Sequence, residues 1–174
     1  MTAGDLVTIQ AGGALRGLAA GAALWLLGSG AVARLEAQGR PLSVSGGQDL
    51  AFGMLFPGIT SHITRSDALR SGQFQVTGEK NTTVQVTFTL PPAMLVGSRT
   101  VPMQFGAADG GFSTQATITS ATVFDPRVPL VATLSQQGRL YLFLGGTALP
   151  GVQQTAGSYA APVTVSVCYV GVTC

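Results

Sequence analysis

The last long segment of the chain alternates apolar and polar residues, and this pattern limits what the chain can fold into. After Pro162 the large side chains fall at every second position and small or polar ones lie between them: Val163, Val165, Val167 and Tyr169, against Thr164, Ser166 and Cys168. Successive side chains of a strand point to opposite faces, so residues 163–169 are predicted to form a half-buried β-strand. Gly157 and Ser158 supply a turn before it.

The chain after Arg40 repeats this pattern, without a sustained helical period. The clearest further strand is 82–90, which Pro91-Pro92 ends because proline cannot donate to a sheet. Residues 78–81 are predicted to make a hairpin-like connection before it, and 59–71 a polar loop. The other predicted strands are 42–45 continued by 49–53 across a bulge at Gly46-Gly47, then 73–76, 101–105, 113–119, 131–134 and 139–144. About eight antiparallel strands at such spacings predict an all-β sandwich or barrel.

The strand predicted at 139–144 is apolar on both faces. Leu140, Leu142 and Leu144 share one face, while Tyr141 and Phe143 occupy the other. Such a strand is either central and covered or packed against a partner. Tyr141 and Phe143 are therefore candidates for a self-association strand. Together with Tyr159 they are also candidates for a sugar-stacking patch, although aromatic residues in strands are more often core.

Residues 1–33 have the features of a signal peptide. Arg16 precedes the apolar run 17–28, and Ala31-Val32-Ala33 places small residues where a signal peptidase cleaves. Cleavage as late as residue 37 is the second option, and a retained N-terminal anchor is the main alternative. Residues 34–174 are then predicted to form a single domain.

The charge content favours an exported protein without a nucleic-acid partner. Charged residues make up 9% of the chain, the net charge is +2, and the basic residues are scattered. A surface of Thr, Ser, Gln and Gly suits a durable β-protein that is secreted or held at the cell surface, in the periplasm or outside the cell. Scattered basic residues give no electrostatic footprint for nucleic acid. Contact with a membrane is expected only through the signal peptide.

No catalytic, cofactor or metal site is predicted. The one histidine, His62, lies in a polar segment without neighbouring cysteine or acidic residues, so it does not indicate a zinc site. Asp109 lies in a glycine-rich stretch and is predicted to be a turn residue. The glycine-rich stretches lack the spacing of a phosphate loop. We therefore expect a protein that is not an enzyme.

The two cysteines, Cys168 and Cys174, lie close together at the C-terminal end. An exported chain allows a disulfide between them, which would close a small loop and fix the tail. Two free thiols, or pairing of Cys174 between chains, are the alternatives.

Several blocks of sequence carry a resemblance to a known family. They are Leu50-Ala-Phe-Gly-Met-Leu-Phe-Pro-Gly58, Gly72-Gln-Phe-Gln-Val-Thr-Gly78, Asn81 with the strand after it, Gly138-Arg-Leu-Tyr-Leu-Phe-Leu-Gly-Gly146, and Gly157-Ser-Tyr159 with its Val-x-Val-x-Val-x-Tyr strand. In this order they resemble the secreted bacterial family called domain of unknown function 4402, and more distantly spore coat protein U and chaperone–usher pilin domains. The resemblance implies an exported immunoglobulin-like β-sandwich with no catalytic residues to carry over.

The N-terminal segment departs from the pilin pattern. A pilin's donor strand needs alternating large apolar residues, and residues 34–47 offer only Leu35, Leu42 and Val44. The sequence thus predicts a structural or cell-surface protein that associates with itself, as a pilus-like fibre or a coat, or with another cell-surface protein. The departure argues against donor-strand exchange and leaves other edge pairing open. The alternative is a secreted module that binds a glycan or a host protein through its loops.

Overall fold

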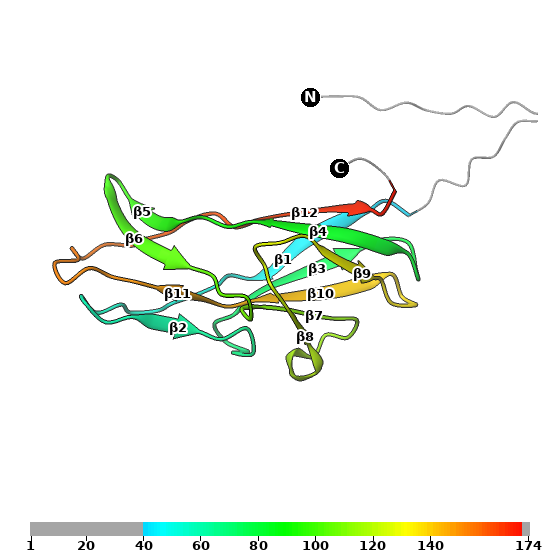
Figure 1. The fold of residues 1–174 in the computed structure, drawn as a ribbon, viewed down its shortest axis with the longest axis horizontal. Coiled ribbons are helices and arrows are strands. Elements are labelled where there is room, and N and C mark those ends of the chain that lie inside the picture. The colour runs from blue at the N-terminus through cyan, green and yellow to red at the C-terminus, as the bar shows by residue number, and fades with distance from the viewer. Residues whose placement is uncertain (1–39, 172–174) are drawn as a thin grey trace, which may run out of the picture. The chain divides into compact units, whose positions relative to one another are not determined.

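The computed structural model describes residues 40–171, and these fold as an all-β unit (Figure 1). Its strands, in chain order, are β1 (Ser43–Gln48), β2 (Ser61–Ile63), β3 (Gly72–Thr77), β4 (Thr83–Thr89), β5 (Ala93–Val96), β6 (Arg99–Gln104), β7 (Gly110–Ser113), β8 (Thr122–Phe124), β9 (Leu130–Thr133), β10 (Arg139–Leu144), β11 (Gly146–Ala148) and β12 (Thr164–Tyr169). One 3₁₀ turn, Ile118–Ser120, lies between β7 and β8. No helix among these residues is long and apolar enough to cross a membrane.

The strands form three antiparallel sheets. One has the order β1-β3-β10-β7-β8, the second β2-β11-β6-β5 and the third β12-β4-β9. The five-stranded and three-stranded sheets pack face to face, as the two layers in Figure 1 show. The sequence prediction of an all-β antiparallel fold is confirmed.

The core between these two layers comes from the predicted alternation. Val84, Val86 and Phe88 point inward from β4 and meet Leu140 and its inward neighbours on β10. A second, smaller core lies at the other end of the unit, where Phe52 packs against side chains of the four-stranded sheet. Those side chains are Ile63, Met94, Val101 and Ala148.

The chain crosses from the five-stranded sheet to the four-stranded sheet at a single glycine. β10 belongs to the five-stranded sheet and β11 to the four-stranded sheet, with only Gly145 between them. Gly145 lies against the backbone of residues 63–65, and its N–H donates to the carbonyl of Asp109 at 2.8 Å. A side chain would not fit here, so glycine allows the close approach that joins the two sheets.

Several predicted elements differ from the structure. The predicted hairpin at 78–81 is wrong, because β3 and β4 belong to different sheets. Residues 49–53 are not a strand, although the register shift of β1 between Gly46 and Gln48 confirms the bulge. The segment predicted as a loop at 59–71 contains β2. The strand predicted at 113–119 is absent beyond Ser113, which is the last residue of β7. The short strands β5, β8 and β11 were not predicted, because three or four residues carry too little alternation.

β10 is a central strand, so it has no free edge with which to pair with another chain. It pairs along one edge with β3 and along the other with β7. Phe143 is only 3% exposed, and Tyr141 is partly exposed on the outer face of the sheet. The central alternative therefore describes this strand, and self-association through the face that carries Tyr141 and Phe143 stays a prediction.

Two predictions fall partly or wholly outside the described residues. The signal peptide at 1–33, and the alternative cleavage as late as residue 37, lie there. Cys168 is disulfide-bonded, but Cys174, its predicted partner, also lies outside, so the pairing stays a prediction.

Candidate binding groove

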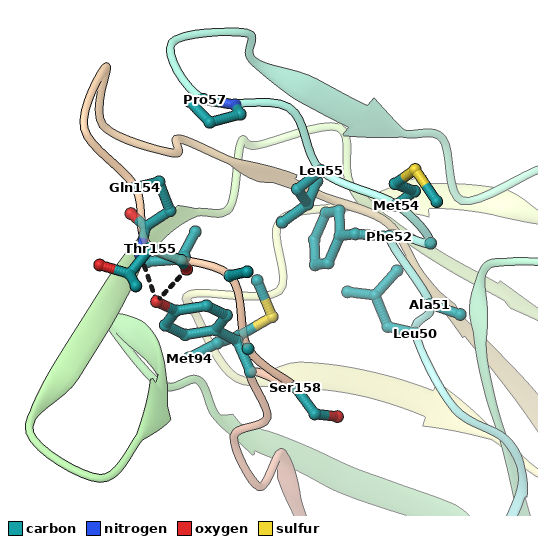
Figure 2. A pocket seen from close by; sticks show the side chains of 15 residues that line it. Leu50, Ala51, Phe52, Met54, Leu55, Pro57, Met94, Gln154, Thr155 and Ser158 are labelled. Atoms are coloured by element: carbon teal, nitrogen blue, oxygen red, sulfur yellow. Dashed lines mark hydrogen bonds between the residues drawn. The ribbon is translucent and has the colours of Figure 1, made fainter.

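An apolar cavity lies at the end of the unit formed by the second core (Figure 2). Its volume is about 530 Å³, within the range of small-ligand pockets. Residues 50–55 and Pro57 line one side and 154–159 the other, with Met94 and Val101 between them. A second cavity of about 400 Å³ shares Leu50, Phe52, Met94 and Tyr159 with it and extends to residues 160–163. We call the two adjoining cavities the groove.

The floor of the groove is hydrophobic core. Phe52, Met94 and Val101 belong to the second core and are each less than 9% exposed. The floor of the second cavity adds Phe74, Met103 and Leu144. Because the floor of the groove is part of the hydrophobic core, its apolar surface is already ordered before a partner binds.

Few backbone N–H groups along the two walls of the groove have a hydrogen-bond partner. On the first wall, Ala51 N–H donates to Arg70 and Gly58 N–H donates to Gly151. Between these two bonds, none of the N–H groups of residues 52–56 donates to another described residue. On the second wall, Ala160 exchanges two hydrogen bonds with Leu95, whereas the N–H groups of residues 156–159 have no partner among the described residues. These N–H groups are therefore open to a partner that the described chain does not supply.

Tyr159 holds the second wall in place. Its hydroxyl donates to the carbonyl of Thr155 at 2.8 Å and accepts from the side-chain amide of Gln154 at 2.6 Å. Figure 2 shows these bonds as dashed lines beside Thr155. The Tyr159 ring faces the groove while its hydroxyl is occupied. The structure does not place Tyr159 with Tyr141 and Phe143, which lie on the outer face of β10, so the three do not form one sugar-stacking patch.

Exposed apolar side chains surround this end of the unit. Met54 is 82% exposed, Phe56 58%, Ile59 60% and Val152 83%. Ile59 N–H donates to the carbonyl of Phe56, closing a turn in which Gly58 takes a positive φ of 72°. Residues 50–60, 91–98 and 148–163 contain no charged side chain. The first cavity and its rim are thus uncharged, whereas Asp49 places one carboxylate on the lining of the second cavity.

Apart from Asp49, the charged residues do not line the groove, and Asp109 and Asp125 stabilise turns. His62, on β2, lies 3.3 Å from the carboxylate of Asp109, a neighbour that sequence spacing did not reveal. Asp109 also accepts from the N–H of Gly106, as expected of a turn residue. Hydrogen bonds from Arg127 lower the pKa of Asp125 to about 2. Within the described part of the chain, no three His, Cys, Asp or Glu residues cluster as a metal site requires.

Sequence reasoning did not predict the groove. The sequence predicts a strand at residues 49–53 and no strand at 148–156, and it singles out neither segment as the lining of a site. One signal was present: the run from Leu50 to Phe56 is apolar and uncharged but does not alternate as a half-buried strand does. Two blocks of the family resemblance, Leu50–Gly58 and Gly157–Tyr159, lie along the groove.

Comparison with known proteins gives no relative from which a role could be transferred. No model of a protein family matches the chain, and neither the curated proteins nor the solved structures contain a significant match.

Proposed function

We propose that this chain is an exported, non-catalytic structural protein of the cell surface, an immunoglobulin-like β-sandwich that assembles with copies of itself into a fibre or coat. The observation that carries the proposal is the groove, with an apolar floor and unpaired backbone on both walls. Export is supported by the sequence of residues 1–33 and by the low charge content.

An extended segment of a neighbouring copy fits the groove best. Such a segment would accept and donate hydrogen bonds along residues 52–56 and 156–159, while its side chains cover the apolar floor. Adding a strand in this way gives affinity through the backbone and specificity through pockets for alternate side chains. The exposed Met54 and Phe56 would be buried in the same contact. Because Asp49 is the one charged residue that lines the groove, a segment without acidic residues is favoured.

The test is the mass in solution of the protein as the cell processes it, measured over a range of concentrations and accompanied by electron microscopy. We expect oligomers or fibres. Met54→Asp places a charge on the rim of the groove at a residue that is 82% exposed, so it should reduce assembly without unfolding the chain. Leu69→Asp is the matched control, because Leu69 is 85% exposed and does not line the groove. A wild-type protein that stays monomeric, or a Met54→Asp variant that assembles normally, contradicts the proposal.

The second candidate function is a secreted binding module that takes a glycan or a host protein at its loops. It is supported by the size of the first cavity and by the loops that line it. A monomeric wild-type protein that binds a glycan or a protein, and loses that binding in Met54→Asp but not in Leu69→Asp, would favour this function over self-assembly.

A further inference from the structure

A second surface, separate from the groove, lies on the outer face of the five-stranded sheet around Tyr141. In the register of this sheet, Tyr141 is paired with Gln75 on β3 and with Ser113 on β7, and Gln75 is paired with Ser45 on β1. Directly paired side chains on one face have Cβ atoms about 5 Å apart. The Tyr141 ring is thus bordered on one side by the amide of Gln75, with Ser45 beyond it. On the other side lies Ser113, which is buried and whose hydroxyl accepts from the N–H of Gln115 at 3.1 Å.

Tyr141 differs from the other two tyrosines of the chain. The hydroxyl of Tyr159 bonds to Thr155 and Gln154, and that of Tyr169 bonds to Arg40 and Glu79. Across residues 40–171, the Tyr141 hydroxyl has no hydrogen-bond partner. A partly exposed ring with a free hydroxyl can stack on an apolar ring face and still bond to a polar group at its edge.

A cation lies next to this ring. Arg139 precedes Tyr141 by two positions on the same strand, so its side chain emerges on the same face about 7 Å away. Arg139 is exposed, and within the described chain its guanidinium has neither an ion pair nor a hydrogen bond. No acidic residue occupies β1, β3, β7 or β10. The face therefore has a positive charge available for a carboxylate.

We infer that the face formed by Tyr141, Arg139 and Gln75 binds a polysaccharide that contains uronic acids. A sugar ring stacks on Tyr141, its hydroxyl groups bond to the amide of Gln75 and to the Tyr141 hydroxyl, and a uronate carboxylate pairs with Arg139. The ring selects a sugar over a simple polyanion, and the arginine selects an acidic sugar over a neutral one. This surface is independent of the groove, so it stands whether or not the protein self-assembles.

The test measures binding of the processed protein to polygalacturonate, alginate and hyaluronan, with dextran as the neutral polymer and polyacrylate as a polyanion without sugar rings. We expect binding to at least one of the three polyuronates and weaker binding to dextran and polyacrylate. Tyr141→Ala should weaken binding about tenfold or more, because the stacking surface is lost, while Tyr141→Phe should retain most of it. Arg139→Gln should reduce binding to the polyuronate toward that of dextran.

Arg99→Gln is the matched control, since Arg99 is an exposed arginine on β6, in a different sheet. It should bind as the wild type does. The Met54→Asp variant should also bind normally, which separates this surface from the groove. Absence of binding to all three polyuronates, equal binding to polyacrylate, or unchanged binding by a folded Tyr141→Ala variant overturns the inference.

Discussion

Replacing Gly145 with alanine should destabilise the fold, because Gly145 is where the chain crosses between two sheets. A Cβ at this position would lie 2.5 Å from the carbonyl oxygen of Ile63 and 2.7 Å from the backbone nitrogen of Arg65. Both obstacles are backbone atoms, so no flexible side chain can move aside. Overpacking typically costs 1–3 kcal/mol, and here the pairing of Gly146 with Ile63 would be strained as well. We expect a loss of about 3 kcal/mol, which is a change of more than a hundredfold in the unfolding equilibrium.

The assay is urea unfolding followed by fluorescence or circular dichroism, comparing midpoints at equal slope. Gly46→Ala is the matched control, since it lies in β1 and a Cβ there would meet no atom within 4 Å. That variant should stay within about 1 kcal/mol of wild type or gain slightly in stability, because alanine restricts the unfolded chain. If Gly145→Ala is also within 1 kcal/mol of wild type, the close approach of residues 63–65 to Gly145 is not as described.

Three further predictions concern stability. Leu142→Ala should cost about 2–5 kcal/mol in the same assay, because Leu142 is fully buried in the central strand β10, and a smaller loss would mean that this core is loosely packed. Tyr169→Phe should cost about 1–3 kcal/mol, since the hydroxyl that accepts from Glu79 N–H and donates to the Arg40 carbonyl is lost; an unchanged midpoint would contradict this link. The pKa of Asp125 is lowered from 3.8 to about 2 by Arg127, so the stabilisation it gives is complete above pH 3.8 and is lost as the pH falls toward 2. Asp125→Asn should make the acid-induced loss of stability smaller over that pH range, and an identical acid profile would refute the assignment.

β4 and β12 were predictable because their side chains alternate over six or seven residues, and β10 because it is a continuous apolar run that ends at a glycine pair. β4, β10 and β12 all occur where the pattern of apolar residues indicated them, within one or two residues at each end. The order of strands within the sheets was not predictable, since local alternation does not specify which strands pair. Residues 78–81 illustrate this: the turn was expected, but the chain passes from one layer to the other there instead of folding back as a hairpin.

The groove was less predictable than the strands for a physical reason. Its walls are defined by backbone groups that lack partners, and a sequence shows side chains but not which backbone groups are paired. The apolar run from Leu50 to Phe56 indicated buried surface, and the structure shows that only part of it is covered: Phe52 is 6% exposed and Met54 is 82% exposed. The sequence also could not show that the Tyr141 hydroxyl lacks a hydrogen-bond partner, because that depends on which side chains the neighbouring strands place beside it.

Backbone hydrogen exchange, measured by mass spectrometry on the dilute monomer and on the assembled protein, shows whether the groove holds a strand of a neighbouring copy. The amides of residues 52–56 and 156–159 should exchange fast in the monomer, since they have no partner within the described chain. They should slow markedly on assembly, because an added strand pairs with them. Amides in β10 should be protected in both states, since that strand is paired along both edges. Assembled protein in which residues 52–56 and 156–159 still exchange as fast as in the monomer would contradict the proposal that the groove holds a neighbouring strand.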